Sequence, residues 1–252
     1  MSDQANNAHA FAALHVKGDP LVLFNIWDAG SAKAVTEAGA KALAIGSWSV
    51  AAAHGYPDGE KLPLDLALEN FKRIVAATSL PVSMDIESGY GKTPDEVART
   101  VARIIEAGAI GCNLEDSYPE SGKLRPVEEQ VARIRAARKA AQAAGIDYFI
   151  NARTDVFFQK PAAQHDQAML EEAIARAKAY AQAGASGIFA PGLADIGLIK
   201  RMVEGAVLPL NIMASTGTPA RAELAAAGVA RISHGPGPYR AAMKALAALA
   251  QA

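Results

Sequence analysis

The sequence predicts one (β/α)₈ (TIM) barrel over residues 1–252, with an N-terminal helix before the first strand. The chain has 252 residues, 51% of them hydrophobic, which suits either one barrel or two small domains. Alanine-rich amphipathic segments alternate with short apolar runs along the whole sequence. No proline-rich linker or block of charge interrupts this alternation, so one barrel is preferred over two domains.

Five segments of a weak internal repeat define most of the elements. They read "EAGAKALAIGS", "EAGAIGCNLED", "AAGIDYFINAR", "QAGASGIFAPG" and "AAGVARISHG". Each closes an alanine-rich segment with glycine and runs into a short apolar stretch, as expected for a helix with a C-terminal glycine cap followed by a buried strand. The predicted caps are Gly39, Gly108, Gly145, Gly184 and Gly228.

Three further apolar runs bring the total to about eight strands. They are "LVLFNI" from Leu21, "LPVSMDI" from Leu80 and "LPLNIM" from Leu208. The alternative architecture is a doubly wound open sheet, which requires a glycine-rich GxGxxG turn after the first strand. Because "FNIWDAGSAKA" supplies no such turn, the barrel is preferred.

Composition excludes several classes of function. The formal net charge of -1 offers neither a basic surface for nucleic acid nor a polybasic patch for membranes. The first residues lack the pattern of a signal peptide, and no stretch is apolar enough to span a bilayer. The single cysteine, Cys112, rules out an internal disulfide and a cysteine metal cluster. We expect a cytoplasmic protein with a small-molecule substrate.

Two acids follow the apolar run that begins at Leu80. In "SMDIESGYG" the alternation of a strand places Asp85 and Glu87 on one face. Catalytic groups of a barrel lie at the C-terminal ends of its strands, so these acids are candidates for the site. The simpler alternative is that they end the strand and start a surface loop.

The next two strands add further polar groups to the same end. In "GCNLED" the alternation aligns Asn113 with Glu115, whereas Cys112 faces the helices as a small core residue. In "YFINARTD" it aligns Asn151, Arg153 and Asp155, which directs Arg153 toward the acids. Polar side chains thus concentrate on the third to fifth strands.

Asp85, Glu87 and Glu115 would repel one another unless a proton or a cation lay among them. The histidines show no paired spacing, so an all-oxygen site favours Mg²⁺, with Mn²⁺ as a substitute, over zinc. We expect Asp85 to be the direct ligand and Glu87 to act through water. The guanidinium of Arg153 suits a substrate carboxylate or enolate oxygen, and its alternative role is an ion pair with Asp155 or Glu115.

Five motifs in this order, "NIWDAGSA", "GYPD", "DIESGYG", "NLED" and "NARTD", resemble the isocitrate lyase and phosphoenolpyruvate mutase superfamily. The resemblance covers nearly the whole barrel. It implies dimers that exchange a terminal helix, here "PYRAAMKALAALAQA", and that assemble further into tetramers. The predicted partners are therefore a small 2-oxoacid or dicarboxylate and other copies of this chain.

The resemblance also assigns roles to residues. It places Asp85, Glu87 and Glu115 around Mg²⁺, and the backbone amides of a loop on a substrate carboxylate. The candidate catalytic residues are Arg153, Asp58 and Glu115. The candidate substrate-binding residues are Ser47, Trp48 and Ser49 in the loop after the second strand, Asp85, Arg153, and Asn211 at the end of "LPLNIM".

Two departures from the family pattern bear on the reaction. Glu87 stands where the family usually has aspartate. The loop "EDSYPESGKLRPVEEQ" contains neither the cysteine and histidine of the lyase motif nor the asparagine-bearing gate of the mutases. What remains is the shared chemistry, in which Mg²⁺ chelated by a 2-oxo group and its carboxylate stabilises a pyruvate-type enolate.

The expected function is therefore that of a Mg²⁺-dependent lyase acting on a small 2-oxo or 2-hydroxy dicarboxylate. Oxaloacetate decarboxylation ranks first because CO₂ leaves without needing a proton. The alternatives are a methylisocitrate lyase-like or phosphonopyruvate (C–P bond) enzyme and a non-catalytic 2-oxoacid-binding protein. A phosphate site at "SHGPGPYR" ranks lower because Pro236 and Pro238 lack amide donors. Residues 117–125 are expected to form a mobile lid rather than a packed turn.

Overall fold

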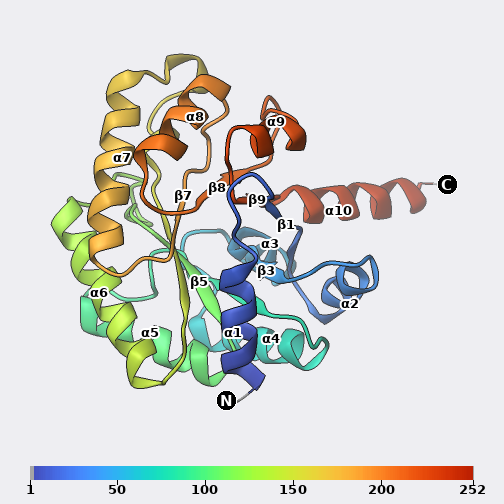
Figure 1. Ribbon diagram of the computed structural model, residues 1–252. Coiled ribbons are helices and arrows are strands. Elements are labelled where there is room, and N and C mark those ends of the chain that lie inside the picture. Colours follow the sequence, from blue (N-terminus) through green and yellow to red (C-terminus); the bar gives the residue numbers. More distant parts are fainter. Residues whose placement is uncertain (1–2, 252) are drawn as a thin grey trace.

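The computed structural model of the protein describes residues 3–251, so residues 1, 2 and 252 of the predicted domain lie outside the described part. The described residues form a nine-stranded parallel sheet that curls into a barrel with helices around it (Figure 1). The strands are β1 (Leu21–Leu23), β2 (Asn25–Ile26), β3 (Leu43–Ile45), β4 (Val82–Asp85), β5 (Gly111–Glu115), β6 (Phe149–Arg153), β7 (Gly187–Phe189), β8 (Leu210–Met213) and β9 (Arg231–Ser233).

Helices that follow the strands form the outer layer, whereas the first helix precedes the strands and the last one extends away from the barrel (Figure 1). They are α1 (Asp3–Ala13), α2 (Ala29–Glu37), α3 (Ser47–Ala53), α4 (Leu64–Ala76), α5 (Pro94–Glu106), α6 (Val127–Ala143), α7 (Gln167–Gln182), α8 (Ile196–Gly205), α9 (Arg221–Ala226) and α10 (Gly237–Leu249), with short 3₁₀ turns η1 (Val156–Phe158) and η2 (Ala162–Gln164).

The first predicted strand is interrupted at Phe24, and the pairing of its two parts with different neighbours closes the barrel. β1 pairs with the last strand, where Leu23 lies opposite Ser233, and β2 pairs with β3. Counting β1 and β2 as one interrupted strand leaves the eight strands of a (β/α)₈ barrel, which confirms the predicted fold class. Phe24 itself is half exposed and stacks on the ring of His234 at 4.2 Å.

The predicted cap glycines all end their helices in the left-handed region. Their φ angles lie between +69° at Gly145 and +104° at Gly108. At Gly184 (φ +102°) a Cβ atom would also lie 2.9 Å from Cγ of Arg138, so a side chain is excluded by both conformation and space. The repeat in the sequence is thus a repeat of helix ends.

The N-terminal ends of the strands form a closed floor. Helix α1 buries Ala8 and Phe11 against strand residues that face the barrel interior, among them Leu21, Leu23 and Phe149. Phe11 meets the Phe149 ring edge-on at 5.4 Å, and His15 stacks on the same ring at 4.0 Å. This end is plugged, which leaves the C-terminal ends of the strands as the open end of the barrel.

Helix α10 leaves the barrel and extends away from it (Figure 1). None of its residues is buried, and Met243, Leu246 and Leu249 are exposed. No helix within residues 3–251 has the length and apolar content that crossing a membrane would require.

Candidate active site

Asp85 ends β4 at the open mouth of the barrel and is held by two neighbouring segments. The hydroxyl of Ser47, the first residue of α3, donates to Oδ2 of Asp85 at 2.9 Å. The backbone N–H of Glu87 donates to Oδ1 at 3.2 Å. The carboxylate of Asp85 therefore has a defined orientation without any bound ligand.

Glu87 does not share a strand face with Asp85, which corrects the prediction. The strand ends at Asp85, and Glu87 takes a left-handed conformation with φ of +51°. Its Oε2 accepts from the backbone N–H of Glu60 at 2.7 Å, and its Oε1 accepts from the hydroxyl of Tyr90 at 3.3 Å. Strand alternation holds only while the backbone stays extended, so the loop and not the strand places this carboxylate.

Four carboxylates lie close together at the mouth, and those of Asp58, Glu87 and Glu115 have raised pKa values. Burial, followed by the charges of Asp85 and Asp58, raises the pKa of Glu87 to about 8. Burial also raises the pKa of Glu115 well above its ordinary value, and partial desolvation and Asp85 raise the pKa of Asp58, although that residue as a whole is exposed. The structure thus brings together the four acids that the sequence pointed to.

Arg153 supplies the positive charge of the site. Nη1 lies 2.7 Å from Oε2 of Glu115, and Nε donates to Oδ1 of Asp155 at 2.6 Å. Burial opposes the charge of the guanidinium, but these two carboxylates outweigh it and hold the pKa of Arg153 above its usual value. The ion pair considered as an alternative is therefore present, and it keeps a cation beside the acids.

The other predicted binding residues are dispersed. Ser49 is fully buried, and Trp48 packs against Tyr239 and under the guanidinium of Arg240 at 4.5 Å from the ring centre. The side chain of Asn211 is engaged with the hydroxyl of Ser233 rather than with the acids. Of this set, Ser47 is the residue that contacts an acid of the site.

A buried cluster behind the mouth was missed by the sequence reasoning. Asp116 is fully buried, and its Oδ1 accepts from the backbone N–H of Asp155 at 2.9 Å. Its Oδ2 accepts from Tyr180 at 2.8 Å and pairs with Arg176 at 3.2 Å. This cluster fixes the end of β6, and the only signal for it in the sequence was a second acid directly after Glu115.

The segment of residues 117–125, which we predicted to be a mobile lid rather than a packed turn, forms a hydrogen-bonded turn. Ser117 and Leu124 form a β-bridge, and the N–H of Tyr118 donates to the carbonyl of Lys123 at 2.9 Å. The Arg125 side chain is buried, lies over the Tyr118 ring and pairs with Glu129 at 2.5 Å. A chain reversal within the turn satisfies its backbone groups, and composition alone does not reveal this.

Cys112 faces the helix layer as predicted. It is fully buried, and burial raises the pKa of its thiol to about 12, so it remains a thiol at neutral pH. This agrees with its interpretation as a core residue and not as a nucleophile.

The chemistry of the mouth fits a hydrated magnesium ion. The oxygen atoms that could bind a metal belong to carboxylates and to one hydroxyl group, and a cation would relieve the repulsion between the carboxylates. Within residues 3–251 no three His, Cys, Asp or Glu side chains are arranged for direct coordination of one metal. Mg²⁺ prefers oxygen ligands, keeps several waters and takes one or two protein carboxylates, so the oxygen atoms around Asp85 fit such an ion.

The fold and the acid-lined mouth define a (β/α)₈-barrel enzyme, and comparison with known proteins identifies its type as that of carbon–carbon lyases and related mutases. The model of the family described as phosphoenolpyruvate phosphomutase matches residues 11–252. The chain belongs to this family, which is part of the phosphoenolpyruvate mutase and isocitrate lyase superfamily.

Curated relatives span several activities. An uncharacterised protein of Mycobacterium tuberculosis is 35% identical over 96% of this chain and 88% of its own length. The 2-methylisocitrate lyase of Escherichia coli is 32% identical over 83% of this chain and 71% of its own. An oxaloacetate decarboxylase of Pseudomonas putida is 30% identical over 94% and 81%. The family is thus shown, whereas its members differ in reaction.

Solved structures agree with this assignment. A Burkholderia cenocepacia protein assigned to the phosphonomutases is 57% identical, with a TM-score of 0.97 over 98% of both chains. A phosphonopyruvate hydrolase in complex with oxalate and Mg²⁺ is 26% identical, with a TM-score of 0.82 over 95% of this chain and 84% of its own.

Proposed function

We propose that this protein is a Mg²⁺-dependent lyase that acts on a small 2-oxo or 2-hydroxy dicarboxylate through a pyruvate-type enolate, with oxaloacetate decarboxylation as the first reaction to test. The observation that carries the proposal is the mouth itself, where acids surround Asp85 and the cation of Arg153 lies beside them. Relatives that decarboxylate oxaloacetate or cleave methylisocitrate support it.

The proposed metal residues are Asp85, with Glu87 and Glu115 around it. When bound there, Mg²⁺ would supply positive charge that stabilises the negative charge of an enolate. Asp85 is already oriented by Ser47 and by the amide of Glu87, so it needs no rearrangement to accept a cation.

The remaining roles follow from charge and position. Arg153 keeps its proton at neutral pH, so its guanidinium would bind a substrate carboxylate or stabilise an oxyanion. To do so it must share the contacts that it now makes with Glu115 and Asp155. The N-terminal amides of α3, at Ser47, Trp48 and Ser49, would receive the second carboxylate, and Asp58 lies at the rim in reach of solvent.

A substrate panel tests the proposal. The purified protein is incubated with Mg²⁺ and, separately, with oxaloacetate, methylisocitrate, isocitrate, dimethylmalate and phosphonopyruvate. Pyruvate is measured for all except isocitrate, for which glyoxylate is measured, and oxalate is measured with oxaloacetate to separate hydrolysis from decarboxylation. We expect pyruvate from oxaloacetate above the rate of Mg²⁺ alone, and loss of that activity with EDTA.

Two outcomes would redirect the assignment. Turnover of methylisocitrate or phosphonopyruvate in preference to oxaloacetate would replace the proposed substrate within the same chemistry. Tight binding of oxalate with Mg²⁺ but no turnover of any of the five would identify a 2-oxoacid-binding protein instead.

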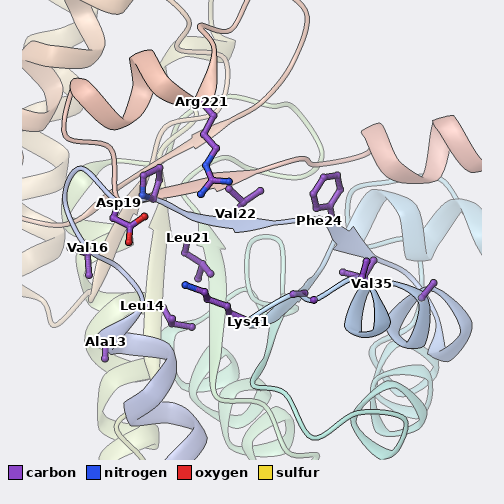
Figure 2. A pocket seen from close by; sticks show the side chains of 15 residues that line it. Ala13, Leu14, Val16, Asp19, Leu21, Val22, Phe24, Val35, Lys41 and Arg221 are labelled. Carbon is purple, nitrogen blue, oxygen red and sulfur yellow. The ribbon is translucent and has the colours of Figure 1, made fainter.

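We also propose that the protein assembles with copies of itself. Helix α10 leaves its apolar residues Met243, Leu246 and Leu249 uncovered. A separate groove of about 570 Å³ lies between α2, α9 and the outer face of β1, with Leu14, Val22 and Val35 among its lining (Figure 2). Two incomplete apolar surfaces on one chain favour a dimer or tetramer in which each covers the other.

Light scattering at micromolar concentration tests this assembly. We expect the mass of a dimer or tetramer for the wild type and a smaller mass for Leu246→Glu, which places a charge on the exposed face of α10. Lys244→Glu, on the same helix, is the matched control for added negative charge. A monomeric wild type would contradict the proposal.

A further inference from the structure

Three residues share an unusual backbone conformation and also contact one another. Glu60, Glu87 and Tyr90 have φ angles of +59°, +51° and +51°, and they are the non-glycine residues with positive φ within residues 3–251. Left-handed φ is costly for such residues and persists where surrounding contacts impose it. Their gathering in one place therefore needs an explanation beyond local sequence.

The side chain of Glu60 joins two loops. Its Oε1 accepts from the backbone N–H of Tyr90 and from the hydroxyl of Ser88, both at 2.8 Å. Its own backbone N–H donates to Oε2 of Glu87 at 2.7 Å, and the Tyr90 hydroxyl closes the circuit on Oε1 of Glu87. The loop that carries Asp58 is thus tied through Glu60 to the loop that carries Glu87.

Helix α6 holds the second loop from the other side. Arg133 is fully buried and donates to the backbone carbonyls of Ser88, Gly91 and Lys92. The loop of residues 87–92 is therefore anchored at its back to a helix, and Glu60 contacts its front. Glu60, Ser88 and Tyr90 also line a recess of about 590 Å³ that opens to solvent beside the mouth.

We propose that Glu60 and Tyr90 are positioning residues that form a latch with Glu87, so that the Asp58 loop and the Asp85–Glu87 segment act as one unit. The latch holds the carboxylate of Glu87 by two donors, the backbone N–H of Glu60 from one loop and the hydroxyl of Tyr90 from the other. This inference rests on the proposed metal site for its effect on Mg²⁺, but the latch itself is a property of the protein without metal.

The decisive variant is Glu60→Ala, which removes both acceptor contacts yet keeps a Cβ atom and therefore the same backbone strain. Glu60→Gln retains Oε1 as an acceptor, and Lys61→Ala changes the exposed neighbour on the same loop. Calorimetry measures Mg²⁺ binding in the presence of oxalate. We expect about tenfold weaker binding for Glu60→Ala, with Glu60→Gln and Lys61→Ala within about twofold of the wild type.

Amide hydrogen exchange of residues 86–92 in the metal-free protein is the second readout. We expect faster exchange in Glu60→Ala, where the Tyr90 amide loses its acceptor, and wild-type exchange in Glu60→Gln. Unchanged exchange in Glu60→Ala overturns the latch whatever happens to Mg²⁺. If the wild type binds no Mg²⁺ with oxalate, the proposed function fails, and the exchange data still decide the latch.

Tyr90→Phe serves if Glu60→Ala does not fold. It removes only the hydroxyl that donates to Glu87. We expect about threefold weaker Mg²⁺ binding and unchanged unfolding temperature, because a neutral donor at 3.3 Å contributes modestly. Wild-type Mg²⁺ affinity in this variant would overturn the positioning role of Tyr90.

Discussion

The two ends of the barrel both bury ionisable side chains, but they treat charge in opposite ways. At the mouth, burial and neighbouring acids raise the pKa values of Glu87 and Glu115, which lie beside Asp85. At the floor, burial and the nearby Arg231 lower the pKa of His15 to about 3, so its ring is neutral and stacks on Phe149. The mouth needs a cation or protons to relieve the repulsion among its acids, whereas the floor stacks a neutral imidazole on Phe149 beside the buried guanidinium of Arg231.

This difference predicts that the residues of the mouth serve binding and that those of the floor serve stability. Replacing a group at the mouth should change ligand affinity at little cost to folding, and at the floor the reverse should hold. The following variants test that separation, beginning with the largest expected effect.

Asp85→Asn should give the largest change. The substitution keeps the shape of the side chain and removes the charge of the predicted direct ligand, so Mg²⁺ binding in the presence of oxalate should weaken by about a hundredfold. Calorimetry measures the affinity, and thermal unfolding of the metal-free protein should show equal or slightly higher stability than the wild type. Equal Mg²⁺ affinity in the two proteins would refute the metal site.

Glu87→Gln tests the mouth through pH. The folded-state pKa of Glu87 is about 8 and its ordinary value is 4.5, so the native state binds the proton more tightly. Its contribution to stability is full below pH 4.5 and is lost as pH rises through 8, by up to about 1.4 kcal/mol per unit. In EDTA, urea unfolding should show this decline in the wild type and a smaller decline in Glu87→Gln. Parallel pH profiles would contradict it.

His15→Phe tests the floor, where the sign is reversed. The folded-state pKa of His15 is lowered from 6.5 to about 3, so the unfolded chain binds the proton more tightly. Stability is therefore lost as pH falls from 6.5 toward 3, by up to about 1.4 kcal/mol per unit. Phenylalanine preserves the stacking. The free energy of unfolding of His15→Phe should therefore rise relative to that of the wild type as the pH falls from 7 to 5. A constant difference would show that His15 does not titrate on unfolding.

Arg231→Met should give the smallest change. Arg231 is fully buried in β9, and burial lowers the pKa of its guanidinium to about 9. Exchange of a poorly solvated charge for an apolar chain of similar length should leave the free energy of unfolding within about 1 kcal/mol of the wild type, or raise it. A loss of more than about 3 kcal/mol in urea unfolding would mean that the floor depends on this cation.

The strands and the glycine caps could be predicted because each depends on residues adjacent in sequence. An apolar run following glycine needs only a helix end and a buried strand, and the caps from Gly39 to Gly228 all have positive φ. The acids of the mouth could be predicted for a related reason, since parallel strands bring their C-terminal ends together.

The features that were missed depend on contacts between distant segments. The left-handed turn at Glu87 is imposed by Glu60, which is 27 residues away, and the end of β6 is fixed by Asp116 through a contact over 39 residues. The packing of residues 117–125 depends on the buried side chain of Arg125 and its partner Glu129. No local pattern of hydrophobicity encodes such partners.

The interrupted first strand has a consequence for how the chain folds. β1 pairs with β9, where Leu23 lies opposite Ser233, so this pairing joins segments that are far apart in the sequence. During synthesis the ring cannot close until β9 has left the ribosome, and until then its edge strands present unpaired backbone groups. Chains cut short before β9 are thus open sheets, prone to pair with one another, and closure of the ring is the late step that ends this exposure.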